Sequence, residues 1–459
     1  MPLRERKEVQ ALLRHGENLT EGRAALLWSL LIDLVYLALA PVVFLCLLVV
    51  SRGFTRPKLR RGLCSKIWST PLREGSGPSF WIHAVSVGEV LTALPLIEKL
   101  RQAYPDWDLR VSVSTFTGLE VAEKRLPGTT VFYFPLDFSP IVARFLRRHR
   151  PSVVILMELE LWPNFLLGAR RRGVPVLVAN ARITERSASR YRLGGALTRR
   201  FFNLVTSFGA QNAAYRDRFL AVGVDPSRVE VLGNLKHDKE PSPVAARGDA
   251  TRQLLGWSPG DTLVLVAGST HPGEERHFCA HHGELKSRYS QLRLVLAPRH
   301  TERLSAAELS RWGATEPLLR WSTIRQAVSE GRRAEAGSSI LVVDTLGELE
   351  LFYSLADVVF VGGSLVPRGG HNIFEAARLG KPVLFGPHFK NFQEEGDLLI
   401  QERAAISVSG VDGLKASLES LLDRPSERMA LGTRAREVTQ RLRGATDRHM
   451  KWIELYLSG

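Results

Sequence analysis

From residue 79 onward, short apolar runs alternate with stretches in which apolar residues recur at the spacing of a helix. Runs of Val, Ile, Leu and Phe without polar alternation are typical of strands buried on both faces of a parallel sheet. Helical stretches of about 8–15 residues between them indicate βα units. The predicted strands are 80–85, 109–114, 131–134, 152–157, 174–180 and 205–210, followed by 262–268, 292–298, 339–344, 357–363, 382–386 and 404–409.

A polar, Pro-containing stretch at 233–250 interrupts this pattern before it resumes. A chain of 459 residues is also too long for one ordinary core. We therefore predict an α/β protein with two doubly wound domains that face each other across a cleft, with ligands at the carboxyl ends of the strands. The predicted segments are a polar extension at 1–23, a membrane anchor helix at 24–50, a basic juxtamembrane segment at 51–78, an N-terminal domain at 79–235, a linker at 236–250, and a C-terminal domain with terminal helices at 251–459.

The membrane anchor is predicted because residues 24–50 are almost wholly apolar apart from Asp33. Pro41 is expected to kink a helix over this range. As a helix, residues 26–50 would span roughly 37 Å, enough to cross a hydrocarbon core of about 30 Å. A signal peptide is the weaker alternative, because its apolar region is about 7–15 residues long. A buried core helix is disfavoured because the run is apolar on every face. Whether the segment crosses the bilayer or lies in it stays open.

The distribution of charge orients this anchor. Between Arg52 and Arg73 there are seven basic residues and no acidic residue, whereas residues 1–23 mix both signs. The positive-inside rule then places the large C-terminal part of the chain in the cytoplasm, where the basic run would contact anionic lipids. The alternative is a solvated linker.

The overall charge and the cysteines limit the classes of partner. The net charge of +15 favours anionic partners. The basic residues are dispersed and the sequence has no nucleic-acid-binding motif, so we do not expect a nucleic acid among these partners. The three cysteines lie far apart, outside any CxxC or Cys/His spacing, which indicates a reducing compartment and no structural zinc.

A glycine-rich segment, VGGSLVPRGGHNIFE at 361–375, is the strongest candidate for a ligand site. An apolar strand ends in two glycines, and a helix is predicted to open at His371-Asn372. Free backbone N–H groups and the positive end of a helix dipole favour an anion, and glycine lets the backbone approach a phosphate. Glu375 would lie on the same helix face as His371 and accept hydrogen bonds from ribose hydroxyls. The alternative is a glycine-rich connection without a ligand.

Glu89 is the candidate general base of the N-terminal half. It follows Ser86 by three residues directly after a predicted strand. The same spacing is that of a capping box, in which the carboxylate only binds backbone and contributes about 1 kcal/mol. A positioned base instead contributes about 10²–10⁴ in rate. Glu89→Gln distinguishes the two.

Further charged side chains follow other strands of this half. Glu158 and Glu160 come directly after the strand at 152–157, and in extended geometry only one of them can face the cleft. Arg182 suits an acidic substrate group, or it forms a surface ion pair with Glu185. Lys236 is predicted to place a cation at the hinge of the cleft, with an ordinary exposed lysine as the alternative.

In the C-terminal half, three more turns follow predicted strands. They are AGSTHPGEE at 267–275, APRH at 297–300 and DTLGELELFY at 344–353. Each turn alone is weak evidence for a ligand. Together with the glycine-rich segment, they describe a nucleotide pocket at one edge of a sheet.

Taken in order, these motifs resemble the signature segments of 3-deoxy-D-manno-oct-2-ulosonic acid (Kdo) transferases. The resemblance runs from about residue 30 to beyond residue 400 and is carried by WIHAVSVGEV, ELELWPN, NARITERS, GNLKHD, STHPGEE, APRH, DTLGEL and VGGSLVPRGGHNIFEAA. It implies a GT-B fold of two Rossmann-like domains with a membrane-anchored N-terminus. It also implies inverting transfer of Kdo from CMP-Kdo to the phosphorylated, acylated glucosamine disaccharide precursor of lipid A, in lipopolysaccharide biosynthesis, without a metal or another cofactor.

The resemblance also assigns roles by position. It makes Glu89 the proton acceptor, and Glu158 and Lys236 the transition-state stabilisers. The chain departs from the family pattern at Leu159, Thr184 and His237, and none of these residues carries an assigned role. It also departs in the polar extension at 1–23. The implied CMP contacts are Pro298, Arg299, Leu346, Gly347, Glu348, Asn372, Ile373, Phe374 and Glu375.

Two rival functions remain at this point. One is another GT-B transferase with a lipid acceptor, such as a lipid A disaccharide synthase or a nucleoside-diphosphate-sugar enzyme. The other is a catalytically inactive, membrane-anchored scaffold that binds a nucleotide. The joint presence of ELELWPN and NARITERS favours Kdo transfer over the first, and retention of Glu89, Glu158 and Lys236 argues against the second.

Overall fold

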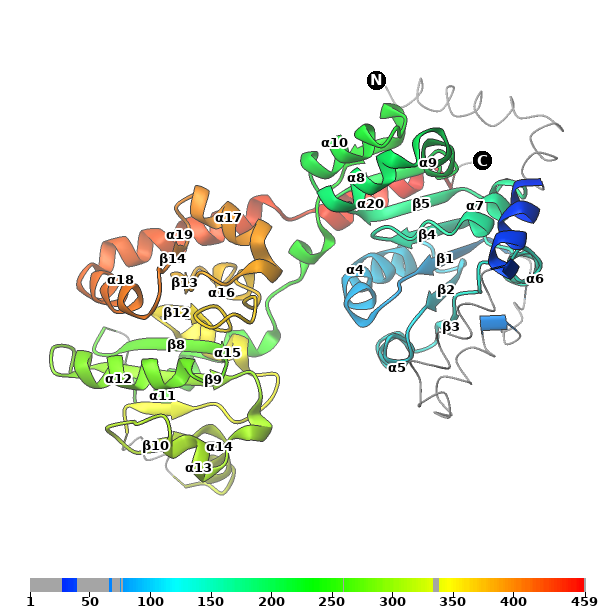
Figure 1. Cartoon of the computed structure of the whole chain (residues 1–459). Coiled ribbons are helices and arrows are strands. Elements are labelled where there is room, and N and C mark those ends of the chain that lie inside the picture. Colours follow the sequence, from blue (N-terminus) through cyan, green and yellow to red (C-terminus); the bar gives the residue numbers. More distant parts are fainter. Residues whose placement is uncertain are drawn as a thin grey trace. The chain divides into compact units, whose positions relative to one another are not determined.

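Each half of the chain contains a parallel sheet, as the apolar runs predict (Figure 1). Within the described residues, both sheets have seven strands, in the orders β3-β2-β1-β4-β5-β6-β7 and β10-β11-β9-β8-β12-β13-β14. Every strand pair in them is parallel. The structure, a computed structural model, describes residues 27–38, 66–67, 75, 77–258, 260–332 and 338–457.

The chain divides into two compact units, 1–239 with 444–459, and 240–443. In the N-terminal unit, helices cover both faces of the sheet. Its elements are β1 (Ser79–His83), α4 (Val87–Ala103), β2 (Asp108–Val113), α5 (Phe116–Arg125), β3 (Thr130–Tyr133), α6 (Ser139–His149), β4 (Val153–Met157), α7 (Pro163–Arg170), β5 (Val176–Ala181), α8 (Glu185–Leu193), α9 (Gly195–Phe202), β6 (Ser207–Ala210), α10 (Ala213–Ala221), η1 (Pro226–Arg228), β7 (Val229–Val231), η2 (Leu235–Asp238) and α20 (Ala445–Glu454).

The C-terminal unit repeats this plan. Its elements are η3 (Pro243–Arg247), α11 (Gly248–Leu254), β8 (Leu263–Thr270), α12 (Glu274–Lys286), β9 (Leu292–Pro298), η4 (Thr301–Arg303), α13 (Ala306–Ser310), β10 (Leu318–Arg320), α14 (Trp321–Ser329), β11 (Ile340–Val342), α15 (Leu349–Leu355), β12 (Val358–Val361), α16 (Phe374–Ala377), β13 (Val383–Phe385), η5 (Lys390–Phe392), α17 (Gln393–Gln401), β14 (Ile406–Ser407), α18 (Val411–Asp423) and α19 (Pro425–Arg441).

Central strands are apolar throughout because both of their faces are covered. In β4, all five residues are buried, and alternate side chains enter different cores. Val154 and Leu156 belong to one core, while Val153 and Ile155 belong to the other. This alternation follows from the two-residue period of a strand.

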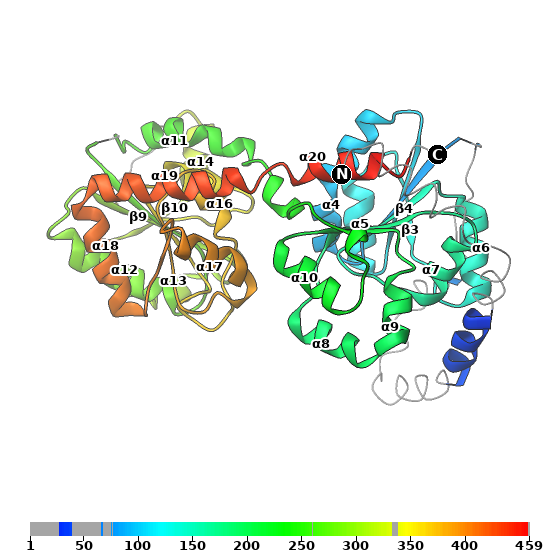
Figure 2. The same cartoon turned by 90° about the horizontal axis from the view of Figure 1, so that it is seen from above.

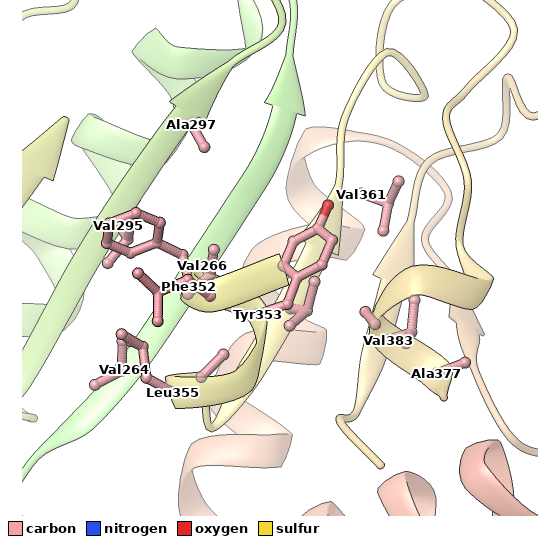
Figure 3. Packing of buried hydrophobic residues seen from close by; sticks show 14 of the residues in the cluster. Val264, Val266, Val295, Ala297, Phe352, Tyr353, Leu355, Val361, Ala377 and Val383 are labelled. Atoms are coloured by element: carbon pink, nitrogen blue, oxygen red, sulfur yellow. The ribbon is translucent and has the colours of Figure 1, made fainter. Parts of the chain in front are cut away.

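In the C-terminal unit, α15 packs across the central strands. Phe352 lies beside Val266 of β8 and Val295 of β9, whereas Tyr353 lies toward Val361 of β12 (Figure 3). The ring of Tyr353 occupies the space that a side chain at Gly268 would need, since a Cβ there would lie 2.3 Å from the Tyr353 hydroxyl. A glycine at this point of β8 therefore allows α15 to approach the sheet.

Both sheets reverse their strand order at a central point, called here the switch point. In the N-terminal sheet it lies between β1 and β4, and in the C-terminal sheet between β8 and β12. At such a point the connections leave the neighbouring strands in opposite directions, which opens a crevice at the carboxyl ends of the strands. Ligands are therefore expected at these two positions.

Two strands were missed by the sequence pattern, β7 and β10. Both have three residues, and β10 and β7 lie at edges of their sheets. An edge strand needs no continuous apolar run, because it is covered less completely than a central strand. The other strands lie within a few residues of the predicted ranges.

The C-terminal boundary differs from the one predicted from the sequence. Residues 444–459 belong to the N-terminal unit and not to a C-terminal domain that extends to residue 459. Trp452 of α20 donates a hydrogen bond to Ser207 of β6 at 3.0 Å, and Figure 2 shows α19 and α20 as helices of different units. The chain therefore passes between the units twice, near residue 239 and near residue 443.

Part of the predicted anchor, residues 27–38, forms a helix against α6 and α7 (Figure 1). Asp33 is buried, and it accepts hydrogen bonds from the backbone N–H of Ser139 at 3.0 Å and from Nδ2 of Asn164 at 2.9 Å. The residue before α6, Phe138, has no side chain that can cap the helix, so Asp33 supplies the cap from a distant segment. The side of this helix that faces the protein therefore carries a buried carboxylate, beside Trp28 and Ile32, which pack against the hydrophobic core.

In the described ranges, no helix has both the length and the apolar character needed to cross a bilayer. The predicted extension at 1–23 lies outside the described residues. So do the rest of the predicted anchor at 24–50 and most of the basic segment at 51–78.

Candidate active site

Glu89 lies in the first turn of α4, directly after β1 at the switch point of the N-terminal sheet. Its Oε2 accepts a hydrogen bond from the backbone N–H of Val85 at 2.9 Å, and Ser86 Oγ donates to its Oε1 at 3.2 Å. The reciprocal capping box is not formed, because the Ser86 side chain does not cap α4. Glu89 therefore binds a backbone N–H group, as the glutamate of a capping box does, but the complete capping box is absent.

Burial and the negative charges of Glu158 and Glu160, opposed by the hydrogen bond from Val85, together raise the pKa of Glu89 to about 7. Desolvation disfavours the charged form of a carboxyl group, and nearby like charges act in the same direction. A carboxyl group with such a pKa accepts and releases a proton near neutral pH. This property suits a general base.

Glu158 follows β4 with a backbone φ of +58°, in the left-handed region that non-glycine residues rarely adopt. Its carboxylate lies 3.6 Å from Lys236 Nζ and 3.9 Å from a guanidinium nitrogen of Arg182. The alternative ion pair between Arg182 and Glu185 is not formed, because among the described residues Arg182 pairs with Glu158. Strained backbone conformations of this kind cluster at functional sites, which supports a functional role for Glu158.

The two glutamates after β4 were expected to alternate, with only one of them facing the site. Glu158 and Glu160 both lie close enough to Glu89 to raise its pKa. The left-handed turn at Glu158 breaks the alternation of an extended chain, which was the basis of that expectation. Glu160 also accepts a hydrogen bond from Nε1 of Trp162 at 3.1 Å, and burial raises the pKa of its carboxyl group.

Lys236 lies in the short helix η2, whose position is set by hydrogen bonds from three directions. Asn234 Oδ1 accepts from the backbone N–H of Lys236 at 3.0 Å. Asn180 Oδ1 accepts from the backbone N–H of Leu235 at 3.0 Å. Asp238 accepts from the backbone N–H groups at the start of α20, including that of Gly444 at 2.7 Å. The returning helix α20 therefore fixes the loop that carries Lys236.

Asn180 and His449 were not identified as positioning residues from the sequence. Asn180 is buried with φ +54°, and its backbone N–H donates to Nε2 of His449 at 3.0 Å. The other ring nitrogen, Nδ1, donates to the carbonyl of Ala445 at 2.8 Å. Burial lowers the pKa of His449 to about 4, so this imidazole is neutral at physiological pH. No local pattern around His449 signals this contact, because its partner lies 269 residues away.

In the C-terminal unit, the glycine-rich segment does not offer the free N–H groups that were predicted at its start. The buried carboxylate of Glu274 accepts from the backbone N–H of Gly363 at 2.7 Å, of Ser364 at 3.1 Å and of Leu365 at 2.9 Å. It also accepts from the backbone N–H of His271 at 2.9 Å. An internal carboxylate thus occupies the place expected for a phosphate, and it joins the loops that follow β8 and β12.

The helix predicted to open at His371-Asn372 begins instead at Phe374 and has four residues. A single turn cannot build a helix dipole of the expected size, since the dipole sums over aligned peptide units. Glu375 accepts a hydrogen bond from Asn372 Nδ2 at 3.2 Å, and Asn372 Oδ1 accepts from the backbone N–H of Phe374 at 3.1 Å. Ile373 and Phe374 belong to the hydrophobic core, and the backbone N–H of Phe374 is already bonded within the turn.

The other predicted CMP contacts lie at the same edge of the sheet. Pro298 ends β9, and Leu346 and Gly347 follow β11. Leu346 is 80% exposed, which is unusual for a leucine and leaves its side chain available to a ligand. Glu348 is engaged within the protein, since its carboxylate accepts from Nε1 of Trp321 and pairs with Arg325, each at 3.1 Å. The structure brings the nine residues to the carboxyl ends of β9, β11 and β12.

Comparison with known proteins decides the family. Residues 56–239 match a family model described as 3-deoxy-D-manno-octulosonic-acid transferase (kdotransferase). The 3-deoxy-D-manno-octulosonic acid transferase of Haemophilus influenzae is 34% identical over 382 residues, 82% of this chain and 87% of that protein. This chain belongs to the Kdo transferase family. The Chlamydophila psittaci transferase is 31% identical over 386 residues, which cover 83% of this chain and 86% of that protein.

Two solved structures share the fold of this Kdo transferase family member. A UDP-GlcNAc 2-epimerase from Neisseria meningitidis aligns with a TM-score of 0.52 at 14% identity, over 83% of this chain and 100% of that chain. A glycosyltransferase from Rickettsia africae aligns with a TM-score of 0.51 at 10% identity, over 83% and 98%. The predicted α/β architecture of two parallel sheets, similar to GT-B glycosyltransferases, is thereby confirmed.

Proposed function

We propose that this chain is an inverting glycosyltransferase of lipopolysaccharide biosynthesis. It moves Kdo from CMP-Kdo to the phosphorylated, acylated glucosamine disaccharide precursor of lipid A. Membership of the Kdo transferase family supports the transferred sugar. The observation that carries the proposal is Glu89, a carboxyl group with a pKa of about 7 at the switch point of a sheet.

In this mechanism, Glu89 removes a proton from the acceptor hydroxyl as the oxygen attacks the anomeric carbon of Kdo. Attack from the face opposite the leaving phosphate inverts that carbon. A base with a pKa close to the working pH combines a useful ionised fraction with enough basicity to take the proton. The Ser86 hydroxyl, 3.2 Å from Oε1, orients the carboxylate.

Lys236 and Glu158 are the proposed transition-state stabilisers. The ammonium group of Lys236 would balance negative charge that develops on the donor, an electrostatic contribution that is large when the group is held in place beforehand. Glu158, 3.6 Å from Lys236 Nζ, would hold the lysine in its position. The hydrogen bonds of η2 reduce the motion of the backbone that carries it.

CMP-Kdo is proposed to bind the C-terminal unit at the carboxyl ends of its strands. Pro298, Arg299 and the Leu346–Glu348 turn would contact the nucleotide from one side of the switch point. Asn372–Glu375 would contact it from the other. Parallel sheets bind nucleotides at this edge because several loops converge there.

The direct test is incubation of the purified protein with CMP-Kdo and the tetraacylated lipid A precursor, followed by mass spectrometry of the lipid. The expected product is the acceptor with added Kdo. Nucleoside-diphosphate sugars replace CMP-Kdo in a parallel reaction, and product there alone would favour another GT-B transferase. An unchanged acceptor, with folded protein that still binds CMP, would favour the scaffold and reject the transferase.

The protein is further proposed to act at the cytoplasmic side of the inner membrane, with residues 24–50 as its anchor. The helix at 27–38 supports this, because Asp33 holds it to the protein while several of its leucines are exposed. A contiguous apolar face on a soluble unit is typical of an interaction with a membrane or a partner. The exposed fractions are 67% for Leu27, 49% for Leu30, 51% for Leu31, 63% for Leu34 and 57% for Leu37.

A vesicle flotation assay tests this placement. Wild-type protein is expected to float with vesicles that contain anionic lipids, and Leu30→Asp with Leu34→Asp is expected to reduce the floating fraction. Leu254→Asp, at an exposed leucine of the C-terminal unit, is the matched control. Equal flotation of all three proteins would contradict a role for the leucine face. Protease accessibility of residues 1–23 in intact inner membranes then reports the orientation of the anchor.

A further inference from the structure

Three imidazoles meet at the switch point of the C-terminal sheet. His271 follows β8, His300 follows β9, and His371 lies in the loop after β12. The Nε2 atoms of His271 and His371 lie 2.9 Å apart, and the two rings are nearly parallel, with an interplanar angle of 6°. The ring of His300 packs edge-on to His271, with centroids 5.6 Å apart. The proposed function gives none of these side chains a role.

The contact between His271 and His371 limits the protons that the pair holds. A hydrogen bond between two imidazole nitrogens needs one donor and one acceptor, so only one of the facing Nε2 atoms carries a proton. If both rings were protonated, two N–H groups would face each other. The 2.9 Å contact therefore excludes protonation of both rings, and a neutral pair, with one donor and one acceptor, satisfies it.

The surroundings of the pair agree with this neutral state. Burial lowers the pKa of His371 to about 4, and the positive charges of Arg299 and His300 act in the same direction as the neighbouring His271. Burial also lowers the pKa of His271, where His300, Arg303 and Arg368 oppose the one raising charge, that of Glu274. The carboxylate of Glu274 accepts from four backbone N–H groups, which compete for its charge.

The protein is built to hold the two rings together. Gly363 has φ +67°, and a Cβ there would lie 3.0 Å from Cδ2 of His371 and 3.1 Å from Cδ2 of His271. Only the bare backbone of glycine leaves room for both imidazoles. Glu274 ties the backbone of His271 to that of Gly363, so the loops after β8 and β12 keep a fixed spacing.

We propose that the His271–His371 pair binds the phosphate of the CMP donor and takes up one proton when it does so. The cations around the pair, Arg299, Arg303 and Arg368, disfavour a proton until an anion arrives. The phosphate anion reverses this balance, since a nearby negative charge favours the charged form of an imidazole. The N–H···N bond then opens, and each ring donates an N–H group to a phosphate oxygen. This assignment rests on the proposed function, because it assumes that the unit binds CMP.

The pair would also act in the transfer step. The bond between the anomeric carbon and the phosphate oxygen breaks, and its electron pair stays on that oxygen as CMP leaves. The proton held by the imidazole pair is shared with the phosphate monoester, which carries more negative charge than the diester of the donor. The acceptor proton goes separately to Glu89. Protons therefore balance without any further reactant.

Isothermal titration calorimetry of CMP binding near neutral pH, in buffers of low and high ionisation enthalpy, measures the proton directly. Wild-type protein is expected to take up about one proton per CMP bound, and its CMP affinity should fall with rising pH above the second phosphate pKa of about 6. Cytidine and free Kdo, titrated separately, should bind without proton uptake. Uptake with free Kdo instead of CMP would assign the pair to a carboxylate and overturn the proposal.

Variants assign the proton to the pair. His271→Gln and His371→Gln are expected to remove the proton uptake and to weaken CMP binding about tenfold or more, because charge-assisted hydrogen bonds to phosphate are lost. Binding of cytidine should be unchanged, which reports an intact nucleoside site. His277→Gln, on α12, is the matched control and should behave as wild type.

The outcomes separate this inference from the proposed function. Wild-type protein that binds CMP and transfers Kdo, but without proton uptake, overturns the inference and leaves the function in place. The same holds if His371→Gln binds CMP as wild type does. Absence of both CMP binding and Kdo transfer rejects the proposed function and the inference together. Zinc binding that both substitutions abolish, without proton uptake on CMP, would identify a metal site and overturn the proposal.

Discussion

The N-terminal switch point is lined by carboxylates, whereas the C-terminal switch point is lined by imidazoles. The two positions have the same topology, since each lies where the strand order of a parallel sheet reverses. Burial raises the pKa of Glu89 to about 7 and lowers that of His371 to about 4. The direction differs because burial disfavours the charged form, which is the ionised acid in one case and the protonated base in the other.

A second difference concerns the carboxylate that each site holds in place. Glu158 is paired with the side chains of Lys236 and Arg182, which remain partly exposed. Glu274 is buried and bound by backbone N–H groups. The first arrangement keeps charged side chains available to a substrate, while the second stabilises the loops. An acidic residue at a strand end therefore has a catalytic or a structural role according to its partners.

The largest expected effect is that of Glu89→Gln. Loss of a positioned base should lower kcat about 10²–10⁴-fold. CMP affinity should stay the same, because the C-terminal unit is unaltered. Steady-state kinetics with CMP-Kdo and the lipid acceptor, together with calorimetry of CMP binding, measure both quantities. Glu98→Gln, at an exposed glutamate of the same helix α4, is the control.

An unchanged rate in Glu89→Gln, with a loss of about 1 kcal/mol in the free energy of unfolding, would make Glu89 a cap only. The N-terminal switch point would then lack the catalytic carboxylate that distinguishes it from the C-terminal switch point.

Lys236→Met is expected to lower kcat about 10²-fold, because a preorganised charge at the transition state is removed. KM for CMP-Kdo should change less than kcat. Rapid quench measurement of Kdo transfer checks the chemical step. Lys239→Met, just beyond η2, should keep nearly the wild-type rate. An equal loss in both variants would indicate a general charge effect instead of a role for Lys236.

Glu274→Gln tests the structural role of the C-terminal carboxylate. The amide NH₂ of glutamine would face backbone N–H donors, which leaves buried donors without an acceptor, and the free energy of unfolding should fall by about 2–3 kcal/mol. Urea unfolding measures this loss. Glu284→Gln, at an exposed ion pair on the same helix, should cost less than about 1 kcal/mol. A stable Glu274→Gln variant with weaker CMP binding would instead give Glu274 a role in the donor site.

The smallest expected effect is a shift of the pH profile in Glu160→Gln. Glu89 acts as a base only when it is ionised, so log kcat/KM should rise with pH up to about 7 and then level off. Glu160 raises the pKa of Glu89, so its neutral replacement should move this acidic limb to lower pH, by up to about one unit. Glu123→Gln, on α5, should leave the limb in place. A limb that moves to higher pH in Glu160→Gln would contradict the electrostatic coupling.

The parts of the fold that the sequence predicted are those with a strong local signal. Central strands such as β4 are continuous apolar runs, and the helices between them follow a regular period. The three-residue edge strands β7 and β10 lack that signal. The assignment of α20 to the N-terminal unit was missed because its contacts, such as His449 with Asn180, join residues far apart in the chain.

The candidate site shows the same division. The residue types at strand ends, including Glu89, Glu158 and Lys236, could be found because parallel strands bring their carboxyl ends to one edge. The use of the N–H groups of Gly363 by Glu274 could not be found, because a buried carboxylate 89 residues away gives no local sign of its partner. The pairing of His271 with His371, 100 residues apart, is of the same kind.

The sequence by itself determined the class of fold, the parallel sheets and the edge at which the chemical groups collect, because these depend on short-range periodicity and on the direction of the strands. Only the tertiary structure decided which of those groups share a proton or a charge. Burial and the distances between side chains set the pKa values of Glu89 and His371, and both arise from packing between segments that are remote in the chain. The chemistry of each switch point is therefore a property of the folded unit.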